Sequence, residues 1–270
     1  MGCLPLTESI FPDKFLLQKK VAVVTGGAGL IGTPIVIGLA QAGATIYIAD
    51  IDEKKGLDLK KIVRKQGLSA EWIRLDITDI SSIKSCIKTI VSKEKKIDIW
   101  VNCAYPRTSD WSTKFEDIKY ESWRKNIDMH LNGYFLCCQQ IAEQMKKQRK
   151  GSIINLCSIY GVVGPNFSIY EGTNATMPAA YAAIKGGIVN FTRYLATYYA
   201  KYNIRVNAVC PGGIYNNQSA NFVKKYSEKT PMGRMGNPDE IAGPVIFLAS
   251  ESSSYVTGHI LMVDGGWTVW

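Results

Sequence analysis

Two side chains in the second half of the sequence could exchange protons with a bound molecule. Tyr181 and Lys185 are four positions apart, a spacing that places the phenol and the ammonium on the same face of a helix. A nearby cation favours the phenolate, so the pair predicts that the pKa of Tyr181 is lowered toward the range of a general acid or base. Taken alone, Tyr181 would be read as an ordinary packed aromatic residue.

A glycine-rich turn lies far upstream of this pair. Gly27, Gly29 and Gly32 spell G-x-G-x-x-G between an apolar run at 21–24 and a predicted helix at 30–42. Such a turn lets the backbone approach a pyrophosphate, which the free N–H groups of the following helix can bind. The two motifs, in this order, predict one domain that holds a dinucleotide and transfers a hydride.

Carboxylates end the two strands expected after the turn. Asp50 lies 18 positions past Gly32, where a carboxylate is expected to bond the ribose hydroxyls. It would repel a 2′-phosphate, so NAD is favoured over NADP, and a helix cap is the alternative role. Asp76, which precedes Ile77 at the end of the third strand, is placed either to accept from the adenine amino group or to cap the next helix.

The elements that must position these residues alternate along the whole chain. Strands are predicted at 21–24, 45–49, 70–75, 97–101, 152–156, 206–209 and 260–263. Helices are predicted at 30–42, 53–66, 81–96, 122–147, 181–202 and 239–249. This alternation predicts an α/β fold, a Rossmann-type doubly wound parallel sheet of about seven strands with helices on both faces.

The expected organisation is a single dinucleotide-binding and catalytic domain over 18–270, after an N-terminal extension over 1–17. No linker or repeat divides the chain. Two long stretches, 157–180 and 211–237, are predicted to be loops that form the substrate side of the site, because loops of that length are usually functional.

Composition excludes several classes of function. The seven cysteines form no C-x-x-C motif and there are only two histidines, so no metal site is expected and the compartment should be reducing and cytoplasmic. The uncharged stretch 21–49 is broken by glycines, which argues against a membrane span. The net charge of +9 is interpreted first as solvated helix ends, with attraction of an anionic small-molecule substrate as the functional alternative. Nucleic-acid binding is not expected, since no reader motif is present.

Taken together, these motifs resemble the single-domain branch of the short-chain dehydrogenase/reductase family. The resemblance covers about residues 18–270. The segments that carry it are 25–32 (TGGAGLIG), 102–104 (NCA), 155–158 (NLCS), 181–185 (YAAIK), 207–212 (NAVCPG) and 263–266 (VDGG).

The resemblance implies a role for each matching residue. Tyr181 would be the general acid/base, Lys185 would bond the nicotinamide ribose and tune the tyrosine, and Ser158 would hold the substrate oxygen. Ile214 would meet the carboxamide through its backbone. The full set expected at the cofactor is Gly26, Gly29, Leu30, Ile31, Gly32, Asp50, Asp76, Ile77, Asn102, Ala104, Lys185, Pro211, Gly212 and Ile214.

One departure from the family pattern concerns the long predicted helix. The family's fourth catalytic residue is an asparagine in an Asn-x-x-Gly pattern, and here His130 occupies that position. His130 could be catalytic by passing protons through water, because the pKa of histidine lies near neutrality. It could equally be a packed helix residue, with Asn126, one turn earlier, supplying the amide.

Two further departures bear on the substrate. Leu30 stands where this branch has a glycine, and Gly26, Gly29 and Gly32 match the spacing of a longer, nucleotide-sugar-modifying branch. The 23 positions from Ser158 to the tyrosine exceed what is common in the family, and the excess is expected to form part of the substrate wall. In this the chain is similar to flagellin-modification oxidoreductases of surface-sugar pathways.

The sequence therefore predicts an NAD(H)-dependent oxidoreductase that interconverts a secondary alcohol and a carbonyl on a sugar, sugar-phosphate or nucleotide-sugar precursor of surface glycans. An epimerase or dehydratase that retains its NAD is one alternative, and a non-catalytic dinucleotide sensor is another. The family resemblance also implies a homodimer or homotetramer, in whose interface Trp267 and Trp270 could be buried.

Overall fold

A seven-stranded parallel sheet forms the centre of the computed structural model, which describes residues 12–173 and 176–270. The strand order is β3-β2-β1-β4-β5-β6-β7. The strands are β1 (Val21–Thr25), β2 (Thr45–Asp50), β3 (Ala70–Arg74), β4 (Ile99–Asn102), β5 (Gly151–Leu156), β6 (Ile204–Pro211) and β7 (Ile260–Val263). The order reverses between β1 and β4, so the predicted doubly wound Rossmann-type sheet is confirmed.

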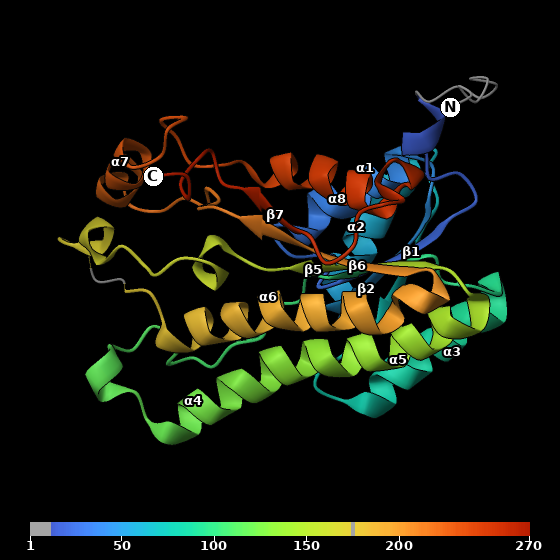
Figure 1. Cartoon of the computed structure of the whole chain (residues 1–270), viewed down its shortest axis with the longest axis horizontal. Helices are drawn as coiled ribbons and strands as arrows, with labels where there is room; N and C mark the ends of the chain where they lie inside the picture. The colour runs from blue at the N-terminus through green and yellow to red at the C-terminus, as the bar shows by residue number, and fades with distance from the viewer. Residues whose placement is uncertain (1–11, 174–175) are drawn as a thin grey trace, which may run out of the picture.

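Helices cover both faces of this sheet (Figure 1). They are α1 (Gly32–Gln41), α2 (Glu53–Lys65), α3 (Ile80–Glu94), α4 (Tyr120–Ile127), α5 (Gly133–Gln148), α6 (Ala179–Tyr199), α7 (Ala220–Glu228) and α8 (Ala242–Ala249). Side chains of α1, α2 and α8 form one buried apolar cluster with the sheet, and those of α3, α5 and α6 form the other. The central strands are buried on both faces, which explains why they read as continuous apolar runs.

The long helix expected over 122–147 is interrupted. The chain forms α4, then a π-helical segment over Asp128–Asn132, then α5. Single π-turns of this kind insert one extra residue into a helix and occur often at functional sites. A continuous helical pattern in the sequence hides this insertion.

The stretch 211–237, expected to be a loop, contains α7. Ser219 caps this helix, because its side chain accepts a hydrogen bond from Phe222 N. Phe222 and Tyr226 turn one face of α7 toward a third apolar cluster, which also includes Trp267. The stretch 211–237 is therefore partly a packed helix, and its expected contact with substrate stays a prediction.

The expected extension 1–17 falls largely outside the described residues. Of its described part, Leu17 is fully buried, and its N–H donates to Ala42 O at 2.7 Å. The packed core thus begins at least one residue before the predicted boundary. Across 12–173 and 176–270, no helix has both the length and the apolar character needed to cross a bilayer.

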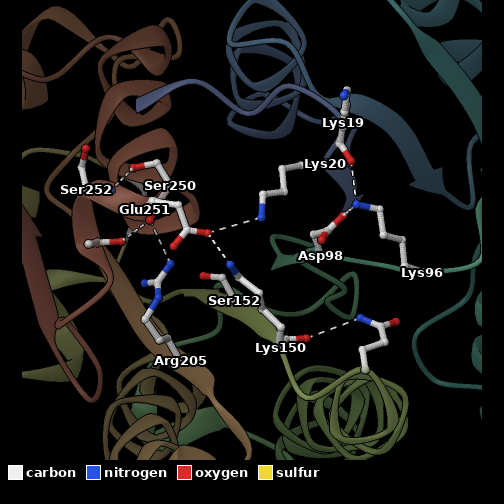
Figure 2. Close-up of polar contacts among 12 residues, drawn as sticks. Lys19, Lys20, Lys96, Asp98, Lys150, Ser152, Arg205, Ser250, Glu251 and Ser252 are labelled. Carbon is white, nitrogen blue, oxygen red and sulfur yellow. Dashed lines mark hydrogen bonds and ion pairs between the residues drawn. The ribbon is translucent and has the colours of Figure 1, made fainter. Parts of the chain in front are cut away.

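Charged side chains join the amino ends of the strands (Figure 2). Glu251 accepts from Lys150 at 2.7 Å and from Lys20 at 3.3 Å, and these lysines directly precede β5 and β1. Arg205, on β6, donates to Ser250 O at 3.1 Å. The network ties three strands to the 3-10 turn Glu251–Ser253, at the edge of the sheet opposite the carboxyl ends of the strands.

Candidate active site at the carboxyl ends of the strands

The residues predicted to act chemically gather at the carboxyl edge of the sheet. Parallel register places Asn102 of β4 beside Asn155 of β5, and Leu156 beside Val209 of β6. Ser158 follows the end of β5 by two residues, and Gly212 directly follows β6. This edge, near the reversal of strand order, is where open α/β sheets bind their ligands.

The turn after β1 accepts only glycine at two positions. Gly26 has φ +62°, and a Cβ there would lie 2.6 Å from Ala104 Cα. A Cβ on Gly32 would lie 2.2 Å from Gly26 O, and α1 begins at Gly32 with its first N–H groups facing the turn. Close backbone packing of this kind is what a glycine turn needs to bring its backbone near a pyrophosphate, so the expected binding of a dinucleotide by this turn stays a prediction. Leu30 and Ile31 complete the turn, with Leu30 exposed.

The side of the turn is fastened to the segment after β4. Thr25 Oγ1 accepts from the N–H groups of Cys103 and Ala104, at 3.0 and 3.2 Å. These bonds fix Ala104 beside Gly26, where it was expected to meet the cofactor.

Asp50 does not cap a helix. Its Oδ2 accepts from Ala28 N at 2.9 Å and its Oδ1 from Asp52 N at 3.0 Å, so the carboxylate fastens the glycine turn to the end of β2. Asp52 is the residue whose side chain caps α2. The cap interpretation of Asp50 is therefore wrong, while its expected contact with the ribose stays a prediction.

Asp76 does not cap the following helix either, because Asp79 caps α3. Asp76 Oδ1 instead accepts from the N–H and the hydroxyl of Thr78, at 2.9 and 2.7 Å. The next residue, Ile77, is buried, and a Cβ on Gly133 would lie 2.8 Å from its Cδ1. The side chain of Ile77 thus belongs to the core, so only its backbone is available to a cofactor.

The side chain of Asn102 is also turned inward. Its amide donates to Asn155 Oδ1 at 2.8 Å and accepts from Trp100 Nε1 at 2.8 Å. Asn155 in turn donates to Thr192 Oγ1 on α6 at 3.0 Å. These buried bonds align β4, β5 and α6, and they leave only the backbone of Asn102 for a cofactor.

The segment after β6 packs closely against its neighbours. Gly212, which follows Pro211, donates its N–H to Val263 O at 2.9 Å, and a Cβ there would lie 2.9 Å from Asp264 Cα. Ile214 forms a bridge with Gly236, and its carbonyl accepts from Gln218 Nε2 at 2.9 Å. These residues line a pocket formed by Gly212, Gly213, Ile214, Met232, Arg234, Gly236, Glu240, Ile241, Val263, Asp264 and Gly265.

Lys185 is buried on α6 and faces the end of β5. Its Nζ donates to Leu156 O at 2.8 Å and lies 3.4 Å from His130 Nε2. It also lies 5.6 Å from the centroid of the Tyr181 ring. Burial lowers the pKa of Lys185, since a charged ammonium loses hydration in this position.

His130 meets Lys185 because the π-helical segment carries it inward. The imidazole is fully buried, and its Nδ1 has no hydrogen-bond partner among the described residues. Burial, followed by the charge of Lys185, lowers the pKa of His130 well below its ordinary value. The expectation of a pKa near neutrality is wrong, and the ring is neutral at physiological pH.

Asn126 does not supply an amide at this position. Its Nδ2 donates to Thr108 Oγ1 and to Ser122 O, both at 2.8 Å, and its Oδ1 accepts from Thr108 N at 3.1 Å. Asn126 is buried and holds the segment after β4 against α4. The alternative in which Asn126 replaces the missing asparagine is therefore not supported by its contacts.

The structure reverses the expected direction for the pKa of Tyr181. Burial is the largest cause and raises the pKa above its ordinary value, whereas a hydrogen bond with Ser158 opposes the rise. The ammonium of Lys185 is directed to a carbonyl and to His130 instead of the phenol oxygen. Ser158 Oγ also accepts from Tyr160 N at 3.2 Å, at the start of a 3-10 turn.

Two aromatic rings flank the phenol. Tyr105 and Trp111 stand edge-on to Tyr181, with ring centroids 5.8 and 6.1 Å away. Neither of these two rings was identified from the sequence as part of the site.

The C-terminal tryptophans have different surroundings. Trp267 is buried within its own chain and stacks on Tyr226 at 4.2 Å, and the Tyr226 hydroxyl accepts from Gly213 N. The idea that Trp267 awaits an oligomer interface is therefore wrong. Trp270 remains 79% exposed.

A family model described as enoyl-(acyl carrier protein) reductase matches residues 27–268. The post-translational flagellin modification protein A of Campylobacter coli is 36% identical over 257 residues, covering 93% of this chain and 99% of that protein. The chain belongs to the short-chain dehydrogenase/reductase family. As a short-chain dehydrogenase/reductase, it is an oxidoreductase that acts on CH–OH groups, and the resemblance found in the sequence is confirmed.

Other members of the short-chain dehydrogenase/reductase family are similarly close. The 3-oxoacyl-[acyl-carrier-protein] reductase of Thermotoga maritima is 36% identical over 256 residues, covering 93% of this chain and 98% of that protein. A solved gluconate 5-dehydrogenase from Burkholderia cenocepacia, in complex with NADP and tartrate, is 31% identical with TM-score 0.86. That match covers 96% of this chain and 98% of the other.

Proposed function

We propose that this short-chain dehydrogenase/reductase interconverts a secondary alcohol and a carbonyl on a sugar, sugar-phosphate or nucleotide-sugar precursor of surface glycans, using NAD(H). The observation that carries the reaction is the group of three side chains at the carboxyl ends of the strands, in which Ser158 and Lys185 are buried and Tyr181 is half-buried between them and the aromatic rings of Tyr105 and Trp111. The sugar assignment is supported by similarity to a flagellin-modification protein and to a gluconate 5-dehydrogenase.

The proposed roles follow from the position of each side chain. A bound nicotinamide would accept or supply the hydride. Ser158 Oγ and Tyr181 Oη hold the substrate oxygen, and Tyr181 passes a proton to or from it. Lys185 holds the nicotinamide ribose, with its ammonium oriented by Leu156 O. The glycine turn binds the pyrophosphate.

We assign His130 a positioning role. An ammonium on Lys185 donates to Nε2 only if that nitrogen is unprotonated, which places the ring proton of the neutral imidazole on Nδ1. The low pKa of the ring keeps it an acceptor across the physiological range. His130 therefore orients the ammonium of Lys185. A role in proton relay would instead require an imidazole whose pKa lies near neutrality.

The preference for NAD(H) rests on Asp50. Its carboxylate lies at the end of β2 and beside the turn, where a 2′-phosphate would meet a like charge. Arg74, at the end of β3, lies opposite Asp50 in the sheet register. It is the candidate cation that could instead bind the 2′-phosphate of NADP(H). Equal kcat/KM with NADH and NADPH would contradict the proposed preference.

Two further properties belong to the same proposal. A reducing, cytoplasmic compartment agrees with six free cysteines in the described part of the chain, five of them buried. A homodimer or homotetramer agrees with the exposed aromatic side chains Phe135, Tyr194 and Tyr198 on α5 and α6.

The test is a turnover screen with gluconate, sugar phosphates and nucleotide sugars, run with NAD⁺, NADP⁺ and their reduced forms. We expect Tyr181→Phe to lower turnover by about 100-fold or more, because general acid/base catalysis contributes on that order. NADH binding, followed by nicotinamide fluorescence, should change little. Equal loss of turnover and binding would contradict the assigned role of the phenol.

The screen also separates the alternatives. Product formation without net change in nicotinamide absorbance, from protein that retains its dinucleotide, would favour the epimerase or dehydratase. Unchanged cellular function in Tyr181→Phe would favour the non-catalytic sensor.

A further inference from the structure

We propose that Arg107 binds an anionic group of the substrate, a carboxylate or a phosphate, beside an aromatic wall formed by Tyr105 and Trp111. This inference rests on the proposed function, since it places the substrate against Tyr181. It names a specificity-determining residue and a chemical class of substrate.

The aromatic wall borders the reactive phenol directly. The rings of Tyr105 and Trp111 stand edge-on to each other at 5.7 Å, and each stands edge-on to Tyr181 at about 6 Å. Tyr105 also contacts His130 at 5.3 Å. Tyr105 remains 40% exposed, so part of its surface is open to a ligand. The apolar face of a sugar or other saturated ring could pack on such a surface.

Arg107 provides the charge at this wall. Its guanidinium carbon lies 5.0 Å from the centroid of the Tyr105 ring, within the range of a cation–π contact. The side chain is exposed, and no carboxylate lies within ion-pair distance of it among residues 12–173 and 176–270. A planar guanidinium without a carboxylate partner can bind a carboxylate or phosphate through two parallel hydrogen bonds.

The backbone on both sides of Arg107 is held in place. Upstream, the N–H groups of Cys103 and Ala104 bond Thr25 Oγ1. Downstream, Thr108 exchanges two hydrogen bonds with the buried amide of Asn126. The guanidinium therefore projects from a segment tethered within a few residues on each side, which reduces the ordering cost of binding an anion.

Arg107 and the reactive phenol border the same aromatic ring. Arg107 and the ring of Tyr181 both lie within 6 Å of the Tyr105 centroid. A ligand that packs on the Tyr105 ring could therefore present its anionic group to Arg107 and a hydroxyl to Tyr181. The net charge of +9 would further attract such a ligand.

The experiment compares ligands that differ in charge. Calorimetric titration of the protein with saturating NADH would measure the Kd of 6-phosphogluconate, gluconate and glucose. We expect the wild type to prefer the anions to glucose by about tenfold or more, and Arg107→Met to remove most of that preference while leaving glucose unchanged. Arg107→Lys should restore part of it, and added salt should weaken it.

Arg193→Met is the matched control. Arg193 is also exposed, but it lies twelve residues beyond Tyr181 on α6, about 18 Å along the helix. This control should bind all three ligands as the wild type does. Melting temperature and NADH affinity, measured for every variant, would reveal any loss of folding.

Each outcome bears on one of the two proposals. Equal affinity of the wild type for anions and glucose, absence of binding of all three, or an anion preference that survives in Arg107→Met would overturn the role of Arg107. Turnover of neutral sugars independent of Arg107 would retain the oxidoreductase proposal and reject this one. Anion binding that depends on Arg107, without hydride transfer to any substrate, would retain the role of Arg107 and reject the oxidoreductase proposal.

Discussion

Tyr181 and Lys185 both lose hydration as the chain folds, and this loss governs how they can act. The spacing of the pair correctly brought them to one face of α6. It could not indicate the direction of the tyrosine pKa, because burial by Tyr105 and Trp111 arises from a distant segment. A phenol with a raised pKa is protonated at neutral pH, so in the mechanism we propose Tyr181 begins carbonyl reduction as the proton donor.

This protonation state predicts opposite pH profiles for the two directions. A raised pKa keeps Tyr181 protonated at neutral pH, so reduction should be constant through neutrality and fall only at alkaline pH. Oxidation needs the phenolate, so its kcat/KM should rise by up to about tenfold per pH unit on the acid side of that pKa. Initial rates from pH 6 to 10 measure both, and an oxidation rate that is flat above pH 7 would contradict the assignment.

The elements differ in how far sequence could predict them. The β1–α1–β2 unit could be located from its glycines, its apolar strand runs and Asp50. These residue types are required locally, by the tight turn and by the buried strands on either side of it. The π-helical segment escaped prediction, since one inserted residue leaves the helical pattern continuous. Helix α7 was missed for another reason: Phe222, Val223 and Tyr226 have helical spacing after the cap residue Ser219, but the segment was read as a loop.

The glycine turn offers a sharp test at the level of this unit. We expect Gly32→Ala to weaken NADH binding by about tenfold or more and to lower the melting temperature, because its Cβ would press on the backbone oxygen of Gly26. Gly243→Ala, in α8, is the matched control, since a Cβ there meets no atom within 4 Å. Fluorescence titration and thermal melts compare the two, and normal NADH binding by Gly32→Ala would show that the turn is not a tight cradle.

At the scale of the whole molecule, the catalytic candidates and the Glu251 ion-pair network lie at opposite ends of the parallel strands. The catalytic candidates occupy the carboxyl ends of the strands, and the network of Lys20, Lys150 and Glu251 occupies the amino ends (Figure 2). The sequence predicted the first edge through its motifs. It could not predict the second, because residues far apart along the chain meet there only after folding.

The network predicts a pH-dependent contribution to stability. A hydrogen bond from Lys150 lowers the pKa of Glu251 in the folded state. The ionised carboxylate therefore stabilises the fold fully above the pKa of the unfolded chain, about 4.3, and this stabilisation is lost as the pH falls through the lower pKa of the folded state. Glu251 is partly exposed, so solvent screening limits the effect to at most about 1 kcal/mol. Glu251→Gln should lower the melting temperature by about 1–3 °C at pH 7 and leave kcat unchanged.

Glu228→Gln provides the comparison, since Glu228 faces Lys224 at 4.0 Å on an exposed helix surface. It should leave the melting temperature unchanged. A destabilisation by Glu251→Gln that persists undiminished at pH 3 would show that packing, not charge, is responsible.

The stacking of Trp267 on Tyr226 has a practical consequence for handling the protein. Because the Tyr226 hydroxyl accepts from Gly213 N, the C-terminus is linked by two contacts to the lining of the pocket after β6. An affinity tag or fluorescent fusion attached after Trp270 would begin only three residues beyond the stacked indole of Trp267. We expect such a fusion to disturb the pocket lining through this contact. Kinetic work should therefore use untagged protein or a cleavable C-terminal fusion.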